Sequence, residues 1–182
     1  MRKEDRRNEQ SKKAIKDGLL KVLESKPLAQ AGVSEVVRAA GISRSTFYVH
    51  YNNLQEVFAD LVNEMHVETR TLKEQLNCQE CQAGQARPFC TLVRDEGRYA
   101  PLVRDPYFMR ASTSGRGLGF ERDVYEDLAR SGMPGYVAEA IFQFQMNGCY
   151  AAARYVNDDE QWTQVRAALD TFIAAGLKAL RL

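Results

Sequence analysis

The clearest hydrophobic pattern in the sequence lies in its second quarter. Apolar residues recur there at the spacing of one face of an α-helix: Leu54, Val57, Phe58, Leu61, Val62 and Met65. Leu72 and Leu76 continue the pattern, so it predicts a helix over residues 54–76, about 22 residues and roughly 33 Å long. A helix of that length predicts a link between two parts of the protein.

Further helices are predicted on both sides of this link. A helix over residues 11–25 follows a charged tail, residues 1–10, that has no apolar periodicity. After a loop at residues 77–85, weaker patterns predict helices over 88–96 and 120–130. The glycine-rich stretch 112–119, which lies between them, predicts a flexible loop or a frayed helix. Two long helices, 136–156 and 158–182, close the chain. Because no segment shows a convincing strand pattern, we expect an all-α fold.

The stretch before the link helix, residues 33–51, has the sequence VSEVVRAAGISRSTFYVHY. Gly41 adopts a left-handed turn at low cost, and Ser43 is a favourable N-cap. These signals predict two short helices joined by a tight turn, with Phe47 and Tyr51 anchoring the second helix. Its hydroxyls, arginine and ring-tipped donors suit contacts with phosphates and base edges. We therefore interpret the stretch as a helix-turn-helix motif.

This pattern, a small residue, Gly, Ile and Ser followed by RSTFYVHY, resembles the DNA-binding domain of the TetR family of bacterial transcriptional regulators. The resemblance covers residues 11–65. Gly32 stands where the family usually has a capping Thr, and Leu54 stands where a Lys usually opens the next helix. The resemblance implies a three-helix helix-turn-helix DNA-binding domain over residues 1–53. It also implies a C-terminal helical effector-binding and dimerisation domain over residues 54–182.

The candidate DNA contacts lie mainly on the second helix of the motif. Arg44 is the candidate for a bidentate guanine contact, and Ser45 and Thr46 suit base edges or a thymine methyl group. The resemblance implies phosphate contacts for Tyr48 and His50. The remaining candidates lie on either side of this helix: Ser34, Asn52, Asn53, Lys12 and Lys13.

The charge distribution agrees with this interpretation. Residues 1–53 carry 11 Lys and Arg against 6 Asp and Glu, whereas residues 54–182 carry 14 against 18, on a chain of net charge +1. A basic N-terminal part with a near-neutral remainder is typical of a nucleic-acid reader with an attached domain. Charge alone fits a solvated surface equally well, so the motif decides between the two.

The last two predicted helices carry more apolar surface than one domain needs. Two such helices from each subunit can form a four-helix bundle, as the resemblance also implies, so we expect a homodimer rather than a monomer with an internal core. The candidate interface residues are Ile141, Phe144, Gly148, Ala152, Tyr155, Trp162, Val165, Leu169, Phe172, Ile173, Gly176 and Leu177.

The resemblance further implies a small-molecule effector that releases a repressor from a palindromic, double-stranded operator. Candidate walls for its pocket are aromatic and apolar residues of the second domain: Phe89, Leu92, Tyr99, Tyr107, Phe108, Tyr125, Phe142 and Met146. Each of these side chains also suits ordinary core packing.

The cysteines suggest an alternative function. Cys78 and Cys81 form a CxxC pair with Cys90 nearby, and such pairs in reduced compartments bind zinc or exchange thiols. A zinc site needs four ligands, and no second CxxC pair is present. A thiol- or metal-sensing regulator that uses these three cysteines remains open, while Cys149 suits a small core position.

Other classes are less well supported. We expect no enzyme activity and no cofactor, because no nucleophile–base pair or metal set is evident. The sequence has no run of about 18 apolar residues and its charged N-terminus lacks a signal peptide's apolar region, so we expect a cytoplasmic protein without a membrane partner. A helical interaction protein without DNA specificity leaves the basic motif unexplained.

Overall fold

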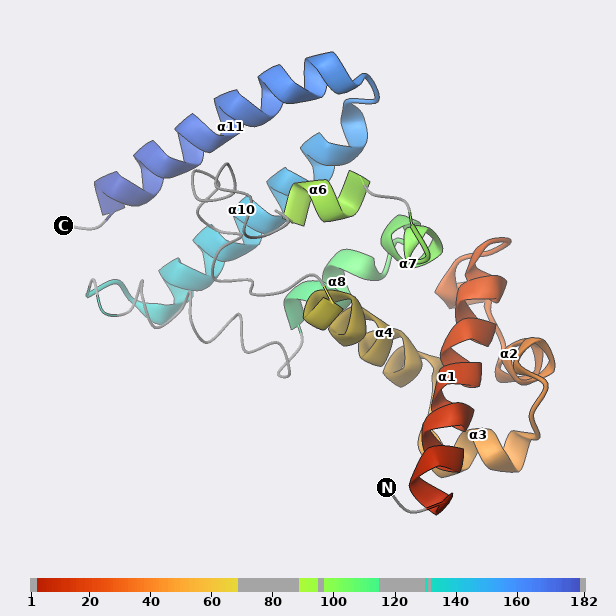
Figure 1. Ribbon diagram of the computed structural model, residues 1–182. Coiled ribbons are helices and arrows are strands. Elements are labelled where there is room, and N and C mark those ends of the chain that lie inside the picture. The colour runs from red at the N-terminus through yellow and green to blue at the C-terminus, as the bar shows by residue number, and fades with distance from the viewer. Residues whose placement is uncertain (1–2, 69–88, 95–96, 115–129, 131, 181–182) are drawn as a thin grey trace. The chain divides into compact units, whose positions relative to one another are not determined.

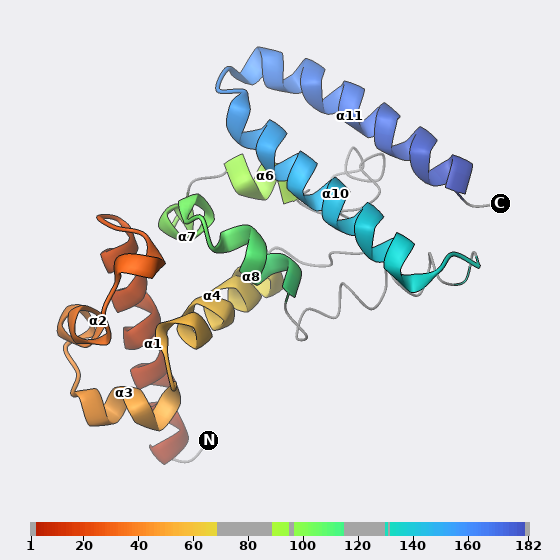
Figure 2. The ribbon, with the colours of Figure 1, turned by 180° about the vertical axis from the view of Figure 1, so that it is seen from behind.

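The computed structural model of the protein describes residues 3–68, 89–94, 97–114, 130 and 132–180. Within these residues every element is an α-helix except the short 3-10 turn Leu28–Gln30, and no strand occurs (Figures 1 and 2). This confirms the predicted all-α fold. None of the described helices is both long and apolar enough to cross a membrane.

The chain divides into two compact units. The first combines Met1–Met65 with Gly97–Ser112, and the second combines His66–Glu96 with Thr113–Leu182. These units do not divide the chain at residue 53, where we expected the first domain to end. The functional division into a DNA-binding domain, residues 1–53, and a ligand-binding and dimerisation domain, residues 54–182, therefore stays a prediction.

The first unit is built on four N-terminal helices. They are α1 (Lys3–Leu23), α2 (Val33–Ala40), α3 (Arg44–His50) and α4 (Leu54–Glu68). Each buries its apolar face, and the side chains with no exposed area include Ile15, Leu19, Val36, Phe47, Phe58 and Leu61. The bounds of α2 and α3 agree with the predicted helix-turn-helix. The predicted continuation of the link helix, residues 69–76, lies outside the described residues.

Helices α1 and α2 approach each other closely at Gly18. A Cβ atom at this position would lie 2.9 Å from the carbonyl oxygen of Val36 and 3.0 Å from the Cβ atom of Ala40. No other residue type fits such a contact without moving the backbone of α2. The glycine therefore sets how α2 sits on α1, although nothing in its sequence neighbourhood indicated this role.

The segment 97–112 completes the first unit. It contains α7 (Ala100–Arg104) and the first residues of α8 (Phe108–Ser114). Leu102 and Phe108 are fully buried, and the ring of Tyr107 meets that of Phe58 edge-on at 5.4 Å. The buried carboxylate of Asp105 accepts a hydrogen bond of 2.7 Å from the backbone N–H of Leu28. These contacts join the segment to the N-terminal helices.

The second unit contains α6 (Phe89–Arg94), α10 (Gly135–Tyr155) and α11 (Asp159–Leu180). Arg94 on α6 donates hydrogen bonds to the carbonyl of Val156 at the end of α10 and, at 2.7 Å, to the carboxylate of Asp159. Its guanidinium also lies 5.0 Å from the centre of the Trp162 ring. One arginine thus satisfies the end of α10 and fastens the turn into α11, and α10 and α11 then run side by side (Figures 1 and 2).

One sequence prediction about helix limits was wrong. Helix α1 begins at Lys3 and not near residue 11, because Lys, Arg, Glu and Gln are good helix formers and Glu9 precedes Lys13 by four residues, a stabilising pair. Helix α8 continues to Ser114, which fits the frayed-helix alternative for the start of the stretch 112–119. The predicted helix at 120–130 lies almost entirely outside the described residues.

Replacing Gly18 with alanine tests the contact between α1 and α2. The added methyl group must displace the backbone of Val36, so Gly18→Ala is expected to lower the free energy of unfolding by about 1–3 kcal/mol. Urea titration monitored by circular dichroism measures this change. Gly135→Ala, where an added Cβ meets nothing within 4 Å, is the control. Equal stability of Gly18→Ala and the wild type would contradict the proposed packing.

Candidate nucleic-acid interface

The turn between α2 and α3 has the geometry that its sequence predicts. Gly41 adopts a left-handed conformation with φ of 67°, and its N–H donates to the carbonyl of Arg38 at 3.2 Å. The hydroxyl of Ser43 then accepts a hydrogen bond from the N–H of Thr46 at 3.1 Å and caps α3. Both predictions are confirmed, and together they fix the point at which α3 begins.

The start of α2 is capped in a different way from the usual family pattern. Gly32 occupies the N-cap position and has no side chain to accept a hydrogen bond. Instead, the carboxylate of Glu35 accepts a bond of 3.0 Å from the N–H of Gly32. Glu35 also pairs with Lys26 at 2.7 Å, and this hydrogen bond, followed by that from Gly32, holds the pKa of Glu35 below its ordinary value.

Helix α3, the reading helix, is anchored by two aromatic residues. Phe47 is fully buried and Tyr51, at the C-cap, is 6% exposed, with 6.1 Å between the ring centres. The phenol of Tyr51 donates a hydrogen bond of 2.5 Å to the carboxylate of Asp60 on α4. Burial, followed by this hydrogen bond, raises the pKa of Tyr51 far above its ordinary value. The phenol therefore stays protonated and remains a donor to Asp60.

The remaining positions of α3 face solvent. Arg44 and Ser45 are exposed, Tyr48 is 55% exposed, and Thr46 and His50 are half-buried. The guanidinium of Arg44 donates a hydrogen bond of 2.7 Å to the hydroxyl of Ser34 on α2, so two predicted DNA contacts lie together. The Ser43 hydroxyl is also 2.8 Å from the hydroxyls of Ser45 and Thr46. The result is a continuous polar surface at the start of the reading helix.

Val49 is a candidate that the sequence reasoning did not single out. It lies on α3 next to Tyr48 and is 75% exposed, the most exposed large apolar side chain of the first unit. An exposed valine on a helix that enters the major groove suits contact with a thymine methyl group. Its position two residues after the buried Phe47 was the signal available in the sequence, since residues two apart on a helix do not share a face.

Asn52 and Asn53, at the start of α4, are both exposed but already hydrogen-bonded. The carboxylate of Glu56 accepts from the backbone N–H of Asn52 at 2.9 Å and from the side-chain amides of both asparagines at 3.0–3.3 Å. The Asn52 backbone bond is the main reason that the pKa of Glu56 lies below its ordinary value. A phosphate contact by either asparagine stays a prediction.

Lys12 and Lys13 lie apart from these residues, on α1. Lys12 is half-buried and Lys13 is exposed. Lys13 borders a shallow surface depression with Asp17, Lys21 and Arg98. A role for the two lysines in binding phosphate stays a prediction.

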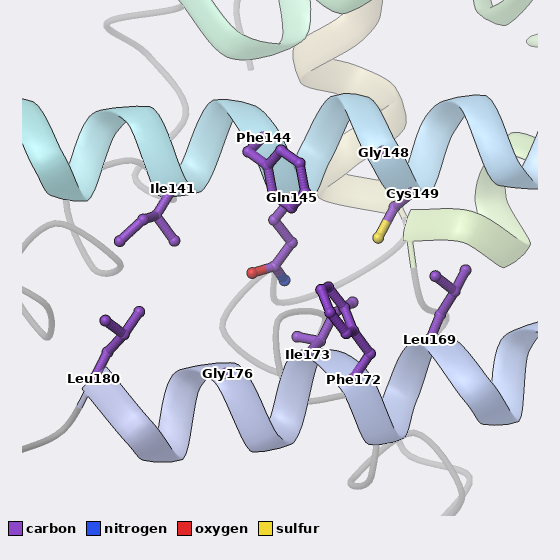
Figure 3. A pocket seen from close by; sticks show the side chains of 10 residues that line it. All are labelled: Ile141, Phe144, Gln145, Gly148, Cys149, Leu169, Phe172, Ile173, Gly176 and Leu180. Carbon is purple, nitrogen blue, oxygen red and sulfur yellow. The ribbon is translucent and has the colours of Figure 1, made fainter.

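The candidate dimer residues gather around a groove of about 300 Å³ between α10 and α11 (Figure 3). Seven of the twelve line it, contributed by the two helices: Ile141, Phe144, Gly148, Leu169, Phe172, Ile173 and Gly176. Gln145, Cys149 and Leu180, which were not among the predicted interface residues, also line the groove. Phe144 and Phe172 are 71% and 65% exposed, an unusual state for phenylalanine.

The other candidate interface residues lie elsewhere on the same two helices. Trp162 is 8% exposed and packs under Arg94, whereas Tyr155 is 86% exposed. Ala152 and Val165 are half-buried and do not line the groove. The side chain of Leu177 lies outside the described residues.

The candidate effector residues are divided between the two units. Tyr99, Tyr107 and Phe108 belong to the first, whereas Phe142 and Met146, 2% and 4% exposed, belong to the second. Tyr99 and Tyr107 have structural partners in Glu64 and Phe58. Tyr125 and the side chains of Phe89 and Leu92 lie outside the described residues. An effector pocket stays a prediction.

The cysteine alternative is tested only in part. Cys78 and Cys81 lie outside the described residues, and Cys90 is a buried free thiol. Among the described residues no group of three or more His, Cys, Asp or Glu is placed to hold a metal ion. Burial raises the pKa of Cys149 to about 11, so this thiol is protonated and weakly nucleophilic at neutral pH.

Two short helices around a left-handed glycine turn, with the second helix anchored by aromatics and otherwise exposed, define a helix-turn-helix protein. Residues 15–61 match the family model described as bacterial regulatory proteins, tetR family. Over these residues the chain is therefore similar to regulatory proteins of the tetR family.

One curated relative supports the same assignment. The uncharacterized HTH-type transcriptional regulator YdgC of Bacillus subtilis (strain 168) is 37% identical to this chain over 46 residues. The matched residues make up 25% of this chain and 24% of YdgC. The chain therefore matches only about a quarter of the length of this relative. No solved structure matches the chain.

Replacing Ser43 tests the cap of the reading helix. Ser43→Ala removes the acceptor for the Thr46 N–H and is expected to lower the free energy of unfolding by about 1 kcal/mol. Ser43→Thr keeps a hydroxyl acceptor and is the control, because it is expected to retain most of the stability. Thermal or urea unfolding of the two variants measures the difference, and equal losses would show that the cap bond is not the cause.

Proposed function

We propose that the protein is a DNA-binding transcriptional regulator that acts as a homodimer on a palindromic operator. The observation that carries this proposal is the reading helix itself, anchored through Phe47 and Tyr51 while Arg44, Ser45 and Tyr48 face solvent. A helix held in this way presents side chains to a major groove without having to unfold or repack. The family match over residues 15–61 supports the same interpretation.

Within the proposed complex, the residues of the reading helix divide into two roles. Arg44 contacts a guanine, Ser45 and Thr46 contact base edges, and Val49 contacts a thymine methyl group. The residues that hold the phosphate backbone are Tyr48, His50, Ser34, Lys12, Lys13, Asn52 and Asn53. The hydrogen bond from Arg44 to Ser34 supports this assignment, because it holds the guanidinium at the exposed start of α3.

The proposed dimer forms through α10 and α11. Their groove is lined almost entirely by apolar side chains, and the exposed Phe144 and Phe172 lie along it. Packing the same two helices of a second copy against it would cover both rings and give a four-helix bundle. Such a dimer places two reading helices in successive major grooves, about 34 Å apart along the DNA.

Control by a small-molecule effector is part of the proposal. An effector changes DNA affinity only if it binds the DNA-competent and the DNA-free arrangements with different affinities. Repression relieved by such a ligand is the proposed mode of action. It rests on the family resemblance, since the candidate pocket residues that are described belong to two separate units.

Binding of the full chain to the DNA that flanks its own gene tests the proposed function. Fluorescence anisotropy is measured across a salt series, with random DNA of the same length as competitor. A specific site is expected to retain its preference as salt rises, because base contacts depend less on ionic strength than phosphate contacts do. Equal affinity for flanking and random DNA at every salt concentration would contradict the proposal.

Arg44→Ala tests the assigned guanine contact. Loss of a bidentate base contact is expected to weaken specific binding by about 1–3 kcal/mol and to relax discrimination at one base position. A panel of single-base operator variants, measured by anisotropy, identifies that position. Lys178→Ala, which removes an exposed cation near the end of α11, is the control. Equal weakening on all sequences would show that Arg44 contacts phosphate instead.

Phe144→Glu tests the proposed dimer. A carboxylate buried in an apolar bundle carries a desolvation cost of several kcal/mol, so the variant is expected to be monomeric in analytical ultracentrifugation and to bind operator weakly. Tyr136→Glu is the matched control, because Tyr136 is an exposed aromatic residue on the same helix that does not line the groove. A dimeric Phe144→Glu protein would place the interface elsewhere.

A further inference from the structure

Helix α4 carries two carboxylates that lack enough positive charge within the N-terminal helices. Asp60 and Glu64 are four residues apart on α4, a spacing at which like charges repel. Lys16 on α1 lies between them, with its ammonium hydrogen-bonded to Glu64 and 3.7 Å from the Asp60 carboxylate. The Lys16 and Glu64 side chains are only 15% and 23% exposed, so water screens this charge imbalance incompletely.

Two residues from a distant part of the sequence complete this cluster. The guanidinium of Arg98 lies 2.8 Å from the Glu64 carboxylate and 3.6 Å from that of Asp17. The phenol of Tyr99 donates to the same Glu64 oxygen at 3.2 Å, and the Arg98 guanidinium lies over the Tyr99 ring at 5.0 Å. Arg98 therefore brings a second cation, beside Lys16, to a cluster of three carboxylates: Asp17, Asp60 and Glu64.

The other end of the cluster reaches the reading helix. Asp60 accepts the 2.5 Å hydrogen bond from Tyr51, the residue that ends α3. The polar contacts thus run from Arg98 and Tyr99 through Glu64, Lys16 and Asp60 to Tyr51. The phenol of Tyr51 remains a donor at any physiological pH, because its pKa is raised by burial and by Asp60.

Arg98 is held at this site by the rest of its segment. Seven residues later, Asp105 is 5% exposed and accepts from the Leu28 N–H at 2.7 Å and from the Tyr107 N–H at 2.8 Å. Leu102, between them, is fully buried. Both ends of α7 are therefore fixed to the N-terminal helices, and Arg98 keeps its position through packing rather than through its ion pairs alone.

We propose that Arg98 and Tyr99 are positioning residues of the DNA-reading helix, which act on Tyr51 through the carboxylates of α4. This inference rests on the proposed DNA-binding function and adds a part of the chain that lies outside the helix-turn-helix. The segment 97–112 continues into the second unit at both of its ends. Loss of the Arg98 cation leaves Glu64 with less positive charge beside it, loosens the Asp60–Tyr51 contact and lowers operator affinity.

A double-mutant cycle on operator affinity tests this coupling. Arg98→Glu is expected to weaken specific binding about tenfold, whereas in a Tyr51→Phe background the same change is expected to have an effect of about twofold or less. Each variant is measured well below its melting temperature, and circular dichroism verifies that it is folded under those conditions. If the fold-losses in operator affinity of the two single variants multiply in the double variant, the two residues act independently and the inference is overturned.

Two further variants separate positioning from the general attraction of DNA for positive charge. Lys21→Glu makes the same charge change beside the same surface depression and is expected to weaken binding much less than Arg98→Glu. Glu64→Arg adds positive charge to the protein, yet it is expected to weaken binding, and Arg98→Glu combined with Glu64→Arg is expected to recover at least about threefold of the loss. Tighter binding by Glu64→Arg, or no recovery in the combined variant, would contradict the inference. A wild-type chain without specific DNA binding would instead contradict the proposed function.

Discussion

The reading helix depends on contacts made beneath it. An isolated helix of seven residues is not stable in water, because nucleation costs more than its few hydrogen bonds return. Its start is therefore fixed by the Gly41 turn and the Ser43 cap, and its end by the buried rings of Phe47 and Tyr51. These constraints leave Ser45 and Val49 exposed along the helix, and Arg44 is exposed at its start.

The helix-turn-helix was predictable from sequence because its signals are local. A glycine that needs positive φ, a serine cap and two aromatics four residues apart each act within one turn of chain. The place of segment 97–112 was not predictable in this way. Apolar residues such as Leu102 and Phe108 indicate burial but not the unit in which they are buried, and the pairing of Arg98 with Glu64 joins residues 34 apart. Gly18 was missed for the same reason.

The C-terminal helices show which features periodicity can predict and which it cannot. Apolar and small residues at helical spacing predicted a shared surface, and the structure gathers Ile141, Phe144, Phe172 and Ile173 around one groove. Trp162 was assigned to the same surface, but it packs under Arg94, whose guanidinium fixes the turn between the helices. Periodicity identifies the apolar face of a helix. It does not identify the partner of each side chain, which here depends on the position of a third helix, α6.

The central claim is that two copies of the chain read one palindromic DNA site through α3. Selection from a random double-stranded DNA library with the full-length wild-type chain tests it most directly, because such a library presents every possible half-site to the protein. The expected result is an enriched palindrome whose half-site centres lie about one helical turn, or a multiple of it, apart. Failure to enrich any sequence, or enrichment of a single site without symmetry, would contradict the account.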